Sequence, residues 1–454
     1  MRDKVLVGIA LLLLTLTAGA QGNVHRQSEQ YEWPADLQVQ QKLRAWQDLK
    51  FGVLIHWGLY AVPGIVESWS ICDENWITRD TTQSYQQYMD WYFGLADEFR
   101  PAQFDPVQWA DACCQAGMRY MIFTTKHHDG FCMFDSRQTD FTIVRHAFSD
   151  DPRRNVLSHV LKAFRDRGFT IGTYFSKPDW HSHLYWWDVY AKKGCNVNYP
   201  VDQHPQRWQQ FCQFTYNQIE EILSNYGSVD ILWLDGGWVC PENRGQDIDM
   251  PRIARMARSC QPGLLVVDRT VHGPFENYLT PERTVPDTLL DYPWESCIPL
   301  SDDWGYVKKP HWKSAQRVIN TLIEVVAKGG SLVLGVGPTP EGLLQPEVVE
   351  RLQQIGSWME RNGQAIYATR PASRYHDGNI WFTAANDGRT LYAIYRLEEG
   401  ETLPSEISWT GNLPRRGVTL LSSGKKLKSC VENQRVIVTL PKNMPQQSFA
   451  MELL

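Results

Sequence analysis

No block of basic residues and no C-x-x-C pair of cysteines occurs in this sequence. Its 45 Lys and Arg residues are outnumbered by 51 Asp and Glu residues, for a net charge of −6, and both signs are mixed along the chain. A protein without a basic block attracts nucleic acid weakly, so we expect no such partner. The ten Cys residues include no C-x-x-C, which argues against a zinc ribbon or a thioredoxin-type site.

Long hydrophobic runs are also missing, apart from one near the first residue. Charged residues precede an apolar run, Val5–Thr17, and the small residues A-G-A follow it. This pattern predicts a secretory signal peptide, residues 1–20, with cleavage near Ala20. The run is short for a membrane span, and no Cys follows the cleavage site to carry a lipid. We therefore expect an exported protein, periplasmic or secreted, without a membrane anchor.

A dinucleotide-binding fingerprint is absent too, although strand and helix patterns alternate through most of the chain. The closest approach to G-x-G-x-x-G is GVGPTP, which has Pro340 in place of the third Gly. The alternation favours an α/β fold with a (β/α)8-like barrel of the TIM type, regular or distorted, over an open doubly wound sheet. Short apolar runs that are typical of buried parallel strands cover Phe51–Trp57, Arg119–Thr125, Thr170–Phe175, Val229–Leu234, Leu264–Val267 and Ser331–Val336.

The pattern changes at about residue 370. From there only short strand-like pieces occur, separated by turn residues, and they read IWFTAA, TLYAIYRL, VTLLSS, RVIVTL and SFAMELL. Such pieces predict a small antiparallel β-sandwich. The predicted organisation is therefore a signal peptide, a barrel over residues 21–368, and a C-terminal antiparallel β-sandwich over residues 369–454.

Polar and aromatic side chains follow five of the predicted strands, where a barrel of this kind carries its active site. These strand ends read LIHWG, TTKHHDG, TYFSKPDWH, LWLDGGW and VVDR. They place His56, His127, His128, Asp235 and Arg269 at one face, together with several Trp residues. Asp235 differs from the others because it directly follows a fully apolar strand, and two Gly residues leave its carboxylate uncovered.

This set of side chains is typical of a glycosidase. Imidazoles would hold a hydroxyl-rich molecule, Trp would stack on its apolar face, and carboxylates would supply acid/base or nucleophilic chemistry. The alternative is a metal-dependent barrel hydrolase that uses His127, His128 and Asp129. However, adjacent residues of a continuing strand point to opposite faces, and the H-x-H spacing occurs only at His181 and His183, in a predicted loop. We therefore expect no metal and no cofactor.

Several segments taken together resemble the α-L-fucosidase family, glycoside hydrolase family 29. They occur in the order of that family from about residue 36 to 371 and read FGVLIHWGLYAVPG, TTKHHDGFCMFDS, YFSKPDWH, ILWLDGGW, PWESC, WGY and LGVGPTPEGLLQPEVVERLQQIGSWMERNGQAIYATRP. The family fold is a (β/α)8-like barrel followed by a β-sandwich. The resemblance implies a retaining exo-hydrolase that releases terminal α-L-fucose from glycans or glycoconjugates without a metal ion.

The resemblance also implies roles for individual residues. Asp235 stands at the position of the family nucleophile. In the first loop, family members often have Glu directly before Trp, whereas here Ser68 intervenes. The family positions that bind the sugar correspond to His56, Glu67, Trp69, His127, His128, Tyr174, Trp233 and Arg269.

The general acid/base comes from a loop that varies within the family. Glu295 in PWESC and Glu282 in LTPER fall in matching segments, and Glu276 is a third candidate. We favour Glu295, because Trp294 flanks it and apolar surroundings raise the pKa of a carboxyl, whereas Arg283 beside Glu282 favours the ionised form. The remaining alternative is a non-catalytic fucose-binding protein, against which the eligible carboxylates argue.

Overall fold

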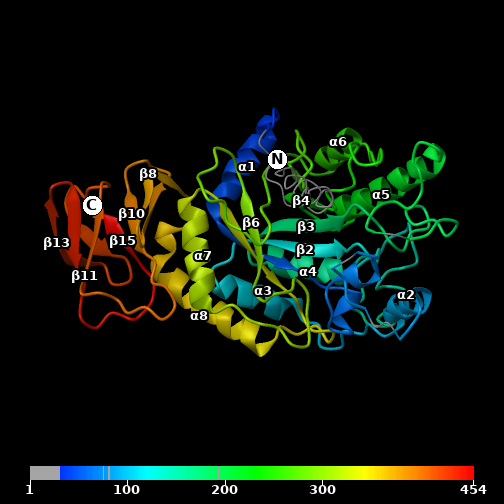
Figure 1. The fold of residues 1–454 in the computed structure, drawn as a ribbon, viewed down its shortest axis with the longest axis horizontal. Coiled ribbons are helices and arrows are strands. Elements are labelled where there is room, and N and C mark those ends of the chain that lie inside the picture. The colour runs from blue at the N-terminus through cyan, green and yellow to red at the C-terminus, as the bar shows by residue number, and fades with distance from the viewer. Residues whose placement is uncertain (1–30, 75, 80–81, 193) are drawn as a thin grey trace, which may run out of the picture.

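The computed structural model describes residues 31–74, 76–79, 82–192 and 194–454 (Figure 1). The predicted signal peptide lies outside the described residues. Within the described part of the chain, no helix is long and apolar enough to cross a membrane. A parallel sheet surrounded by helices is followed by an antiparallel sheet, which occupies the left of Figure 1. The predicted fold class, a (β/α)8-like barrel with a C-terminal β-sandwich, is confirmed.

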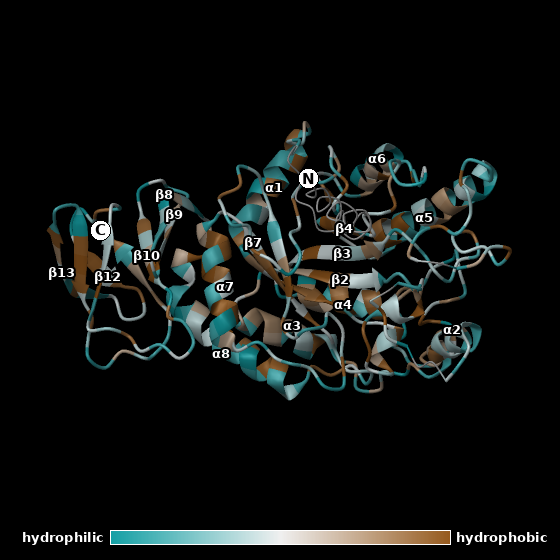
Figure 2. Ribbon diagram, viewed as in Figure 1, coloured by the Kyte–Doolittle hydropathy of each residue, from teal (hydrophilic) through white to brown (hydrophobic). Residues whose placement is uncertain are grey.

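Seven parallel strands curl into the barrel wall in the order β5-β4-β3-β2-β1-β7-β6. Their interior is apolar, and Figure 2 shows hydrophobic residues along the central strands and hydrophilic residues on much of α8. All six predicted strands are confirmed to within two residues, and β6 is additional. The strands are β1 (Phe51–Ile55), β2 (Tyr120–Lys126), β3 (Thr170–Ser176), β4 (Ile231–Asp235), β5 (Leu265–Asp268), β6 (Glu295–Pro299) and β7 (Ser331–Val336).

An irregular segment, residues 275–283, closes the gap between β5 and β6. On one side, Asn277 donates its backbone N–H to Val266 in β5. On the other side, Leu279 and Glu282 of the same segment form parallel bridges with Trp294, just before β6, and with Cys297 in β6. The segment thus takes the place of an eighth strand, and we call it the closing segment. It lacks a regular ladder, because Pro281 has no N–H to donate.

The helices cover the outside of the barrel and begin at identifiable caps. In α3, the side chain of Asp105 accepts hydrogen bonds from the first turn, and Pro106 occupies the first helical position. The α-helices are α1 (Leu37–Leu49), α2 (Tyr85–Gly94), α3 (Pro106–Gln115), α4 (Val156–Arg165), α5 (Pro205–Asn225), α6 (Met250–Cys260), α7 (Ala315–Ala327) and α8 (Pro346–Asn362). Short 3-10 turns are η1 (Leu59–Ala61), η2 (Ser68–Ile71), η3 (Leu95–Asp97) and η4 (Gly363–Ala365).

Eight antiparallel strands follow α8 in the order β11-β14-β13-β12-β15-β10-β9-β8. The five predicted pieces correspond to β9, β10, β12, β14 and β15, and the other three strands are additional. The strands are β8 (Thr369–Asp377), β9 (Ile380–Ala385), β10 (Leu391–Tyr395), β11 (Glu406–Thr410), β12 (Val418–Leu420), β13 (Lys425–Glu432), β14 (Arg435–Thr439) and β15 (Phe449–Leu453).

The C-terminal sheet is apolar on both faces where it meets the barrel helices. Along β9 and β10 the buried residues alternate between two cores, because successive strand residues point to opposite faces. Trp381 and Ile394 belong to the core of the barrel, whereas Phe382 and Ala393 belong to a separate core within the C-terminal strands. Figure 1 shows α7 and α8 between the barrel strands and this sheet. The barrel and the sheet therefore share a continuous buried face.

Candidate active site

A cavity of about 470 Å³ lies at the carboxyl ends of the barrel strands. Its volume is within the range of small-molecule sites, about 300–1,000 Å³. It is lined by every predicted site residue except Glu295, namely His56, Glu67, Trp69, His127, His128, Tyr174, Trp233, Asp235, Arg269 and Glu282. Groups from distant parts of the sequence thus share one cavity.

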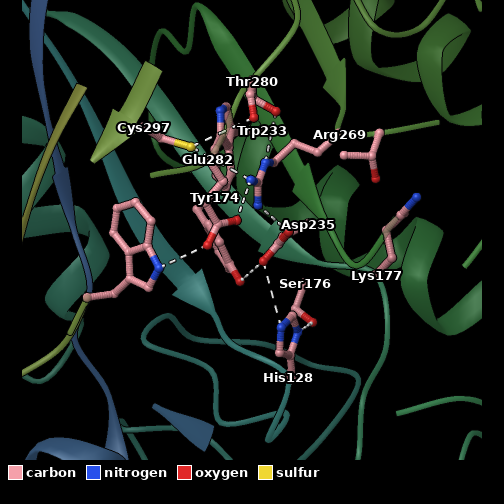
Figure 3. Close-up of polar contacts among 12 residues, drawn as sticks. His128, Tyr174, Ser176, Lys177, Trp233, Asp235, Arg269, Thr280, Glu282 and Cys297 are labelled. Atoms are coloured by element: carbon pink, nitrogen blue, oxygen red, sulfur yellow. Dashed lines mark hydrogen bonds and ion pairs between the residues drawn. The ribbon is translucent and has the colours of Figure 1, made fainter. Parts of the chain in front are cut away.

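Asp235 is the last residue of β4, and its carboxylate is held by two hydrogen bonds. Arg269 donates from Nη1 to Oδ1 at 2.6 Å, and Tyr174 donates its hydroxyl to Oδ2 at 2.6 Å (Figure 3). Burial by itself would raise the pKa of this carboxyl, but the Arg269 guanidinium and the Tyr174 hydroxyl hold that pKa well below its usual range. Asp235 is therefore ionised, as a nucleophilic carboxylate must be.

The two Gly residues after Asp235 permit close packing at this strand end. Gly236 has a φ of +89°, and a Cβ there would lie 2.4 Å from Cδ of Pro178. A Cβ on Gly237 would lie 1.9 Å from Oγ1 of Thr270. Only Gly meets both demands without displacing its neighbours. The D-G-G sequence is thus required by the packing around the carboxylate.

Arg269 connects the two carboxylates of the cavity. Its Nη1 donates to Asp235, and its Nη2 donates to Oε2 of Glu282 at 2.8 Å. Its Nε donates to Oγ1 of Thr280 at 3.0 Å, and its Cζ lies 4.2 Å from the centre of a Trp233 ring. Figure 3 shows this guanidinium between the side chains of Asp235 and Glu282. Every edge of the guanidinium is engaged, so its orientation is defined.

Three histidines line the cavity as neutral rings. Burial lowers the pKa of His56 to about 3 and that of His128 to about 4, and it lowers the pKa of His127 well below its usual range. Ser68 and Ser176 contact Nδ1 of His127 and of His128, respectively, the latter at 2.7 Å. The buried Nδ1 of His56 has no partner among the described residues. Neutral rings of this kind can both donate to and accept from hydroxyl groups.

The first loop brings Glu67 and Trp69 to the cavity although Ser68 lies between them. Glu67 directly precedes η2, and its Oε1 accepts the backbone N–H groups of Trp304 and Gly305 at 2.7 and 2.9 Å. Ser68 turns its hydroxyl to His127. The extra residue therefore supports a histidine ring and removes neither neighbour from the cavity.

Glu295 does not line the cavity. It begins β6, its side chain is fully buried, and its Oε1 accepts a hydrogen bond from Trp233 Nε1 at 3.2 Å. Burial raises the pKa of its carboxyl to about 7, as the sequence predicted, but the residue lies at the amino end of its strand and not at the end that carries the cavity. Glu276 is also buried outside the cavity, where it accepts the Thr270 N–H.

Glu282, the other candidate, does line the cavity. Its Oε2 receives the bond from Arg269, and its Oε1 accepts from Trp304 Nε1 at 3.3 Å. The neighbour Arg283, which the sequence reading emphasised, directs Nη1 to the carbonyl of Asp302 and keeps its Nε 3.9 Å from Glu282. The surroundings of Glu282 are therefore set mainly by residues remote in the sequence.

The three residues of the metal hypothesis do not converge on one point. His127 and His128 line the cavity, but Asp129 does not. The Asp129 carboxylate accepts hydrogen bonds from the Tyr92 hydroxyl at 2.7 Å and from the Phe131 N–H at 3.1 Å. Within the described part of the chain, no group of three or more His, Cys, Asp or Glu side chains could hold a metal ion.

Several residues of the cavity wall were not singled out from the sequence. They are Leu54, Val66, Trp76 and Trp304. Trp304 is the first residue of the WGY motif, to which no role was assigned, and its indole stacks on His56 with ring centres 5.2 Å apart. Trp76 lies in an irregular loop, where no periodicity marks a side chain as facing the cavity. For such residues the only sequence signal is an aromatic residue near a polar motif.

Comparison with known proteins places the chain among glycoside hydrolases. A sequence model described as Alpha-L-fucosidase matches residues 18–364. The tissue alpha-L-fucosidase of Homo sapiens is 31% identical over 415 residues, which cover 86% of this chain and 83% of that protein. The structure of alpha-L-fucosidase isoenzyme 1 from Paenibacillus thiaminolyticus superposes with a TM-score of 0.76 at 26% identity, covering 92% of this chain and 99% of that chain. That of Thermotoga maritima alpha-fucosidase in complex with fucose gives a TM-score of 0.73 at 27% identity, covering 93% and 100%.

Proposed function

We propose that this chain, which belongs to the α-L-fucosidase family, is a retaining exo-α-L-fucosidase with Asp235 as nucleophile and Glu282 as general acid/base. The substrate is a glycan or glycoconjugate that ends in α-L-fucose. Glu282 replaces Glu295, which the sequence favoured, because only Glu282 lines the cavity with Asp235.

One observation carries this proposal. A single guanidinium, that of Arg269, binds Asp235 through one terminal nitrogen and Glu282 through the other. The span of one guanidinium therefore limits the separation of the two carboxylates. Retaining glycosidases keep their carboxyl groups about 5–5.5 Å apart, whereas inverting enzymes leave about 6.5–9.5 Å for a water molecule. The short bridge supports a retaining mechanism.

The reaction proceeds in two displacements. Asp235 attacks the anomeric carbon of fucose while Glu282 protonates the departing glycosidic oxygen, which leaves a fucosyl ester on Asp235. Glu282, now a carboxylate, removes a proton from water, and the water oxygen attacks the same carbon and releases fucose with its configuration retained. Arg269 holds the ionised Asp235 before attack and faces Glu282 as its charge changes.

The remaining cavity residues bind the sugar. The neutral rings of His56, His127 and His128 donate to and accept from its hydroxyl groups, and Trp233 offers an apolar face. Because burial keeps the pKa values of His56 and His128 near 3 and 4, these rings are neutral at near-neutral pH, where Asp235 is ionised. Recognition and bond cleavage are thus assigned to different residues.

The export and domain organisation expected from the sequence complete the proposal. Residues 1–20 direct export and are removed near Ala20, so that the enzyme meets its glycans in the periplasm or outside the cell. Residues 21–368 form the catalytic barrel and residues 369–454 the β-sandwich. The start of β8 at Thr369, shortly after η4, supports that division.

The nucleophile assignment is tested with Asp235→Ala. Loss of the attacking carboxylate should lower kcat/KM for an aryl α-L-fucoside by a factor of about 10³ or more, with an unchanged circular dichroism spectrum. Asp188→Ala, which changes an exposed carboxylate outside the cavity, is the matched control and should retain full activity. Near-normal turnover by Asp235→Ala would refute the assignment.

Azide separates the two glutamates in the same assay. In Glu282→Ala, an aryl fucoside with a good leaving group still forms the ester on Asp235, and azide can then displace it without general-base help. We expect azide to restore turnover and to yield a fucosyl azide of retained configuration. Glu295→Ala should show no such rescue, because its carboxylate does not face the cavity. The reverse pattern would return the acid/base role to Glu295.

A further inference from the structure

Exposure increases from the floor of the cavity to its mouth. The side chains of Tyr174 and Trp233 are buried, and those of Asp235 and Glu282 are 16% and 15% exposed. Two cavity residues are far more open, since Trp76 is 47% exposed and the Arg283 side chain is 45% exposed. Fucose must reach Asp235 to react, so the group attached to fucose extends toward this open end.

Trp76 is connected to the reacting carboxylate through a short series of aromatic contacts. Its ring lies 5.2 Å from that of Trp69, and the Trp69 ring lies 5.2 Å from His128. His128 Nε2 in turn lies 3.7 Å from Asp235. Trp76 is therefore on the same wall as the nucleophile, two aromatic side chains farther out.

The chemistry of the mouth suits a sugar ring. A large indole that stays half exposed at the rim of a cavity leaves apolar surface in water that a ligand can cover. Arg283 does not compete for this role, because its guanidinium is engaged by the carbonyl of Asp302 and lies against Trp304, 5.4 Å from the ring centre. The exposed apolar surface of the mouth is thus concentrated on Trp76.

We propose that Trp76 forms a leaving-group subsite, in which its indole stacks on the sugar to which fucose is attached. The proposal rests on the proposed fucosidase function and extends it to the second sugar of the substrate. Trp69 binds on the fucose side of the cavity, whereas Trp76 acts beyond the scissile bond. The enzyme is accordingly selective for fucosylated oligosaccharides over fucosides with small leaving groups.

Two substrates that differ only beyond the scissile bond test the subsite. Fucosyl fluoride has a leaving group too small to reach Trp76, and a fucosylated lactose places a hexose there. Trp76→Ala should lower kcat/KM for the fucosylated lactose about tenfold, mostly by raising KM, and should leave fucosyl fluoride within about twofold. Trp76→Phe, which keeps an aromatic face, should recover most of the loss.

Trp91→Ala provides the matched control. Trp91 is another exposed indole, at 38%, but it lies on α2 and does not line the cavity, so neither substrate should be affected. If Trp76→Ala lowers kcat/KM equally for both substrates, Trp76 merely supports the fucose site and the subsite proposal is overturned. The proposal is also overturned if kcat/KM falls for neither substrate. Failure of the wild-type enzyme to release fluoride from fucosyl fluoride would overturn the fucosidase function itself, and the subsite with it.

Discussion

Glu295 shows how strongly burial acts on a single carboxyl in this barrel. Its side chain is fully buried, and burial raises its pKa from 4.5 to about 7. The folded chain therefore keeps a proton on Glu295 at pH values where the unfolded chain has lost it. It follows that the stability contributed by this carboxyl is fully present below about pH 4.5 and is lost as the pH rises through about 7.

Removing this titration should stabilise the protein in a pH-dependent way. Glu295→Gln keeps an oxygen that can accept from Trp233 Nε1 but carries no ionisable proton. The free energy of unfolding of the variant minus that of the wild type should be larger at pH 8 than at pH 5, by up to about 3 kcal/mol. Urea denaturation of both proteins at both pH values measures this difference. Glu360→Gln, at an exposed position of α8, should show no such difference. A gain for Glu295→Gln that is equal at both pH values would contradict the buried titration.

The closing segment is the element on which the position of Glu282, the proposed acid/base, depends. It carries Thr280 and Glu282, both of which contact Arg269. Its attachment to β5 relies on Asn277, whose Oδ1 accepts the Val266 N–H at 2.9 Å. A side chain here replaces a backbone acceptor that a regular strand would supply. The position of Glu282 therefore depends on a residue five places earlier in the sequence.

Asn277→Ala should loosen this element. The buried N–H of Val266 would lose its acceptor, which costs about 1–3 kcal/mol of unfolding free energy, and kcat should fall with it because Glu282 is less well held. Asn277→Asp keeps the accepting oxygen and loses the bond from Nδ2 to the Pro274 carbonyl. Its free energy of unfolding and its kcat should therefore both lie closer to the wild-type values than those of Asn277→Ala. Urea denaturation and steady-state kinetics measure the two effects. Full activity in a destabilised Asn277→Ala would separate the segment from catalysis.

The sequence predicted the regular elements well and the closing segment poorly. Apolar strands such as Ser331–Val336 have a local signal, and so do the histidines that directly follow a strand. Strand β6 begins at Glu295 and ends at Pro299, so its residues do not form the apolar run of a buried strand. The choice between the two glutamates had little to rest on for a related reason. It used the chain neighbours of Glu282, whereas its actual partners are Arg269 and Trp304, which are brought to it only by the closed barrel.

At the scale of the whole molecule, the C-terminal sheet and the barrel helices share buried polar contacts as well as an apolar face. Ser448, just before β15, is fully buried, and its hydroxyl donates to Oδ1 of Asn320 in α7 at 2.8 Å. The Ser448 hydroxyl oxygen accepts in turn from Gln316 Nε2 at 2.8 Å and from the Leu397 N–H at 3.0 Å. Trp358 of α8 donates to the Ser448 carbonyl at 2.7 Å. Ser448 thus joins α7 and α8 to the chain that follows β10 and precedes β15, and we expect barrel and sheet to unfold together.

Ser448→Ala tests this coupling. Removing the hydroxyl leaves the buried Leu397 N–H without its acceptor and takes one of three acceptors from Gln316 Nε2, so the free energy of unfolding should fall by about 1–3 kcal/mol. Because one face of the sheet packs into the core of the barrel, loss of fucosidase activity and loss of far-ultraviolet circular dichroism should shift together on a denaturant axis. Ser423→Ala, at an exposed turn of the sheet, should leave both curves unchanged. A circular dichroism transition that precedes the loss of activity would instead show that the sheet unfolds alone, while the barrel keeps its catalytic site.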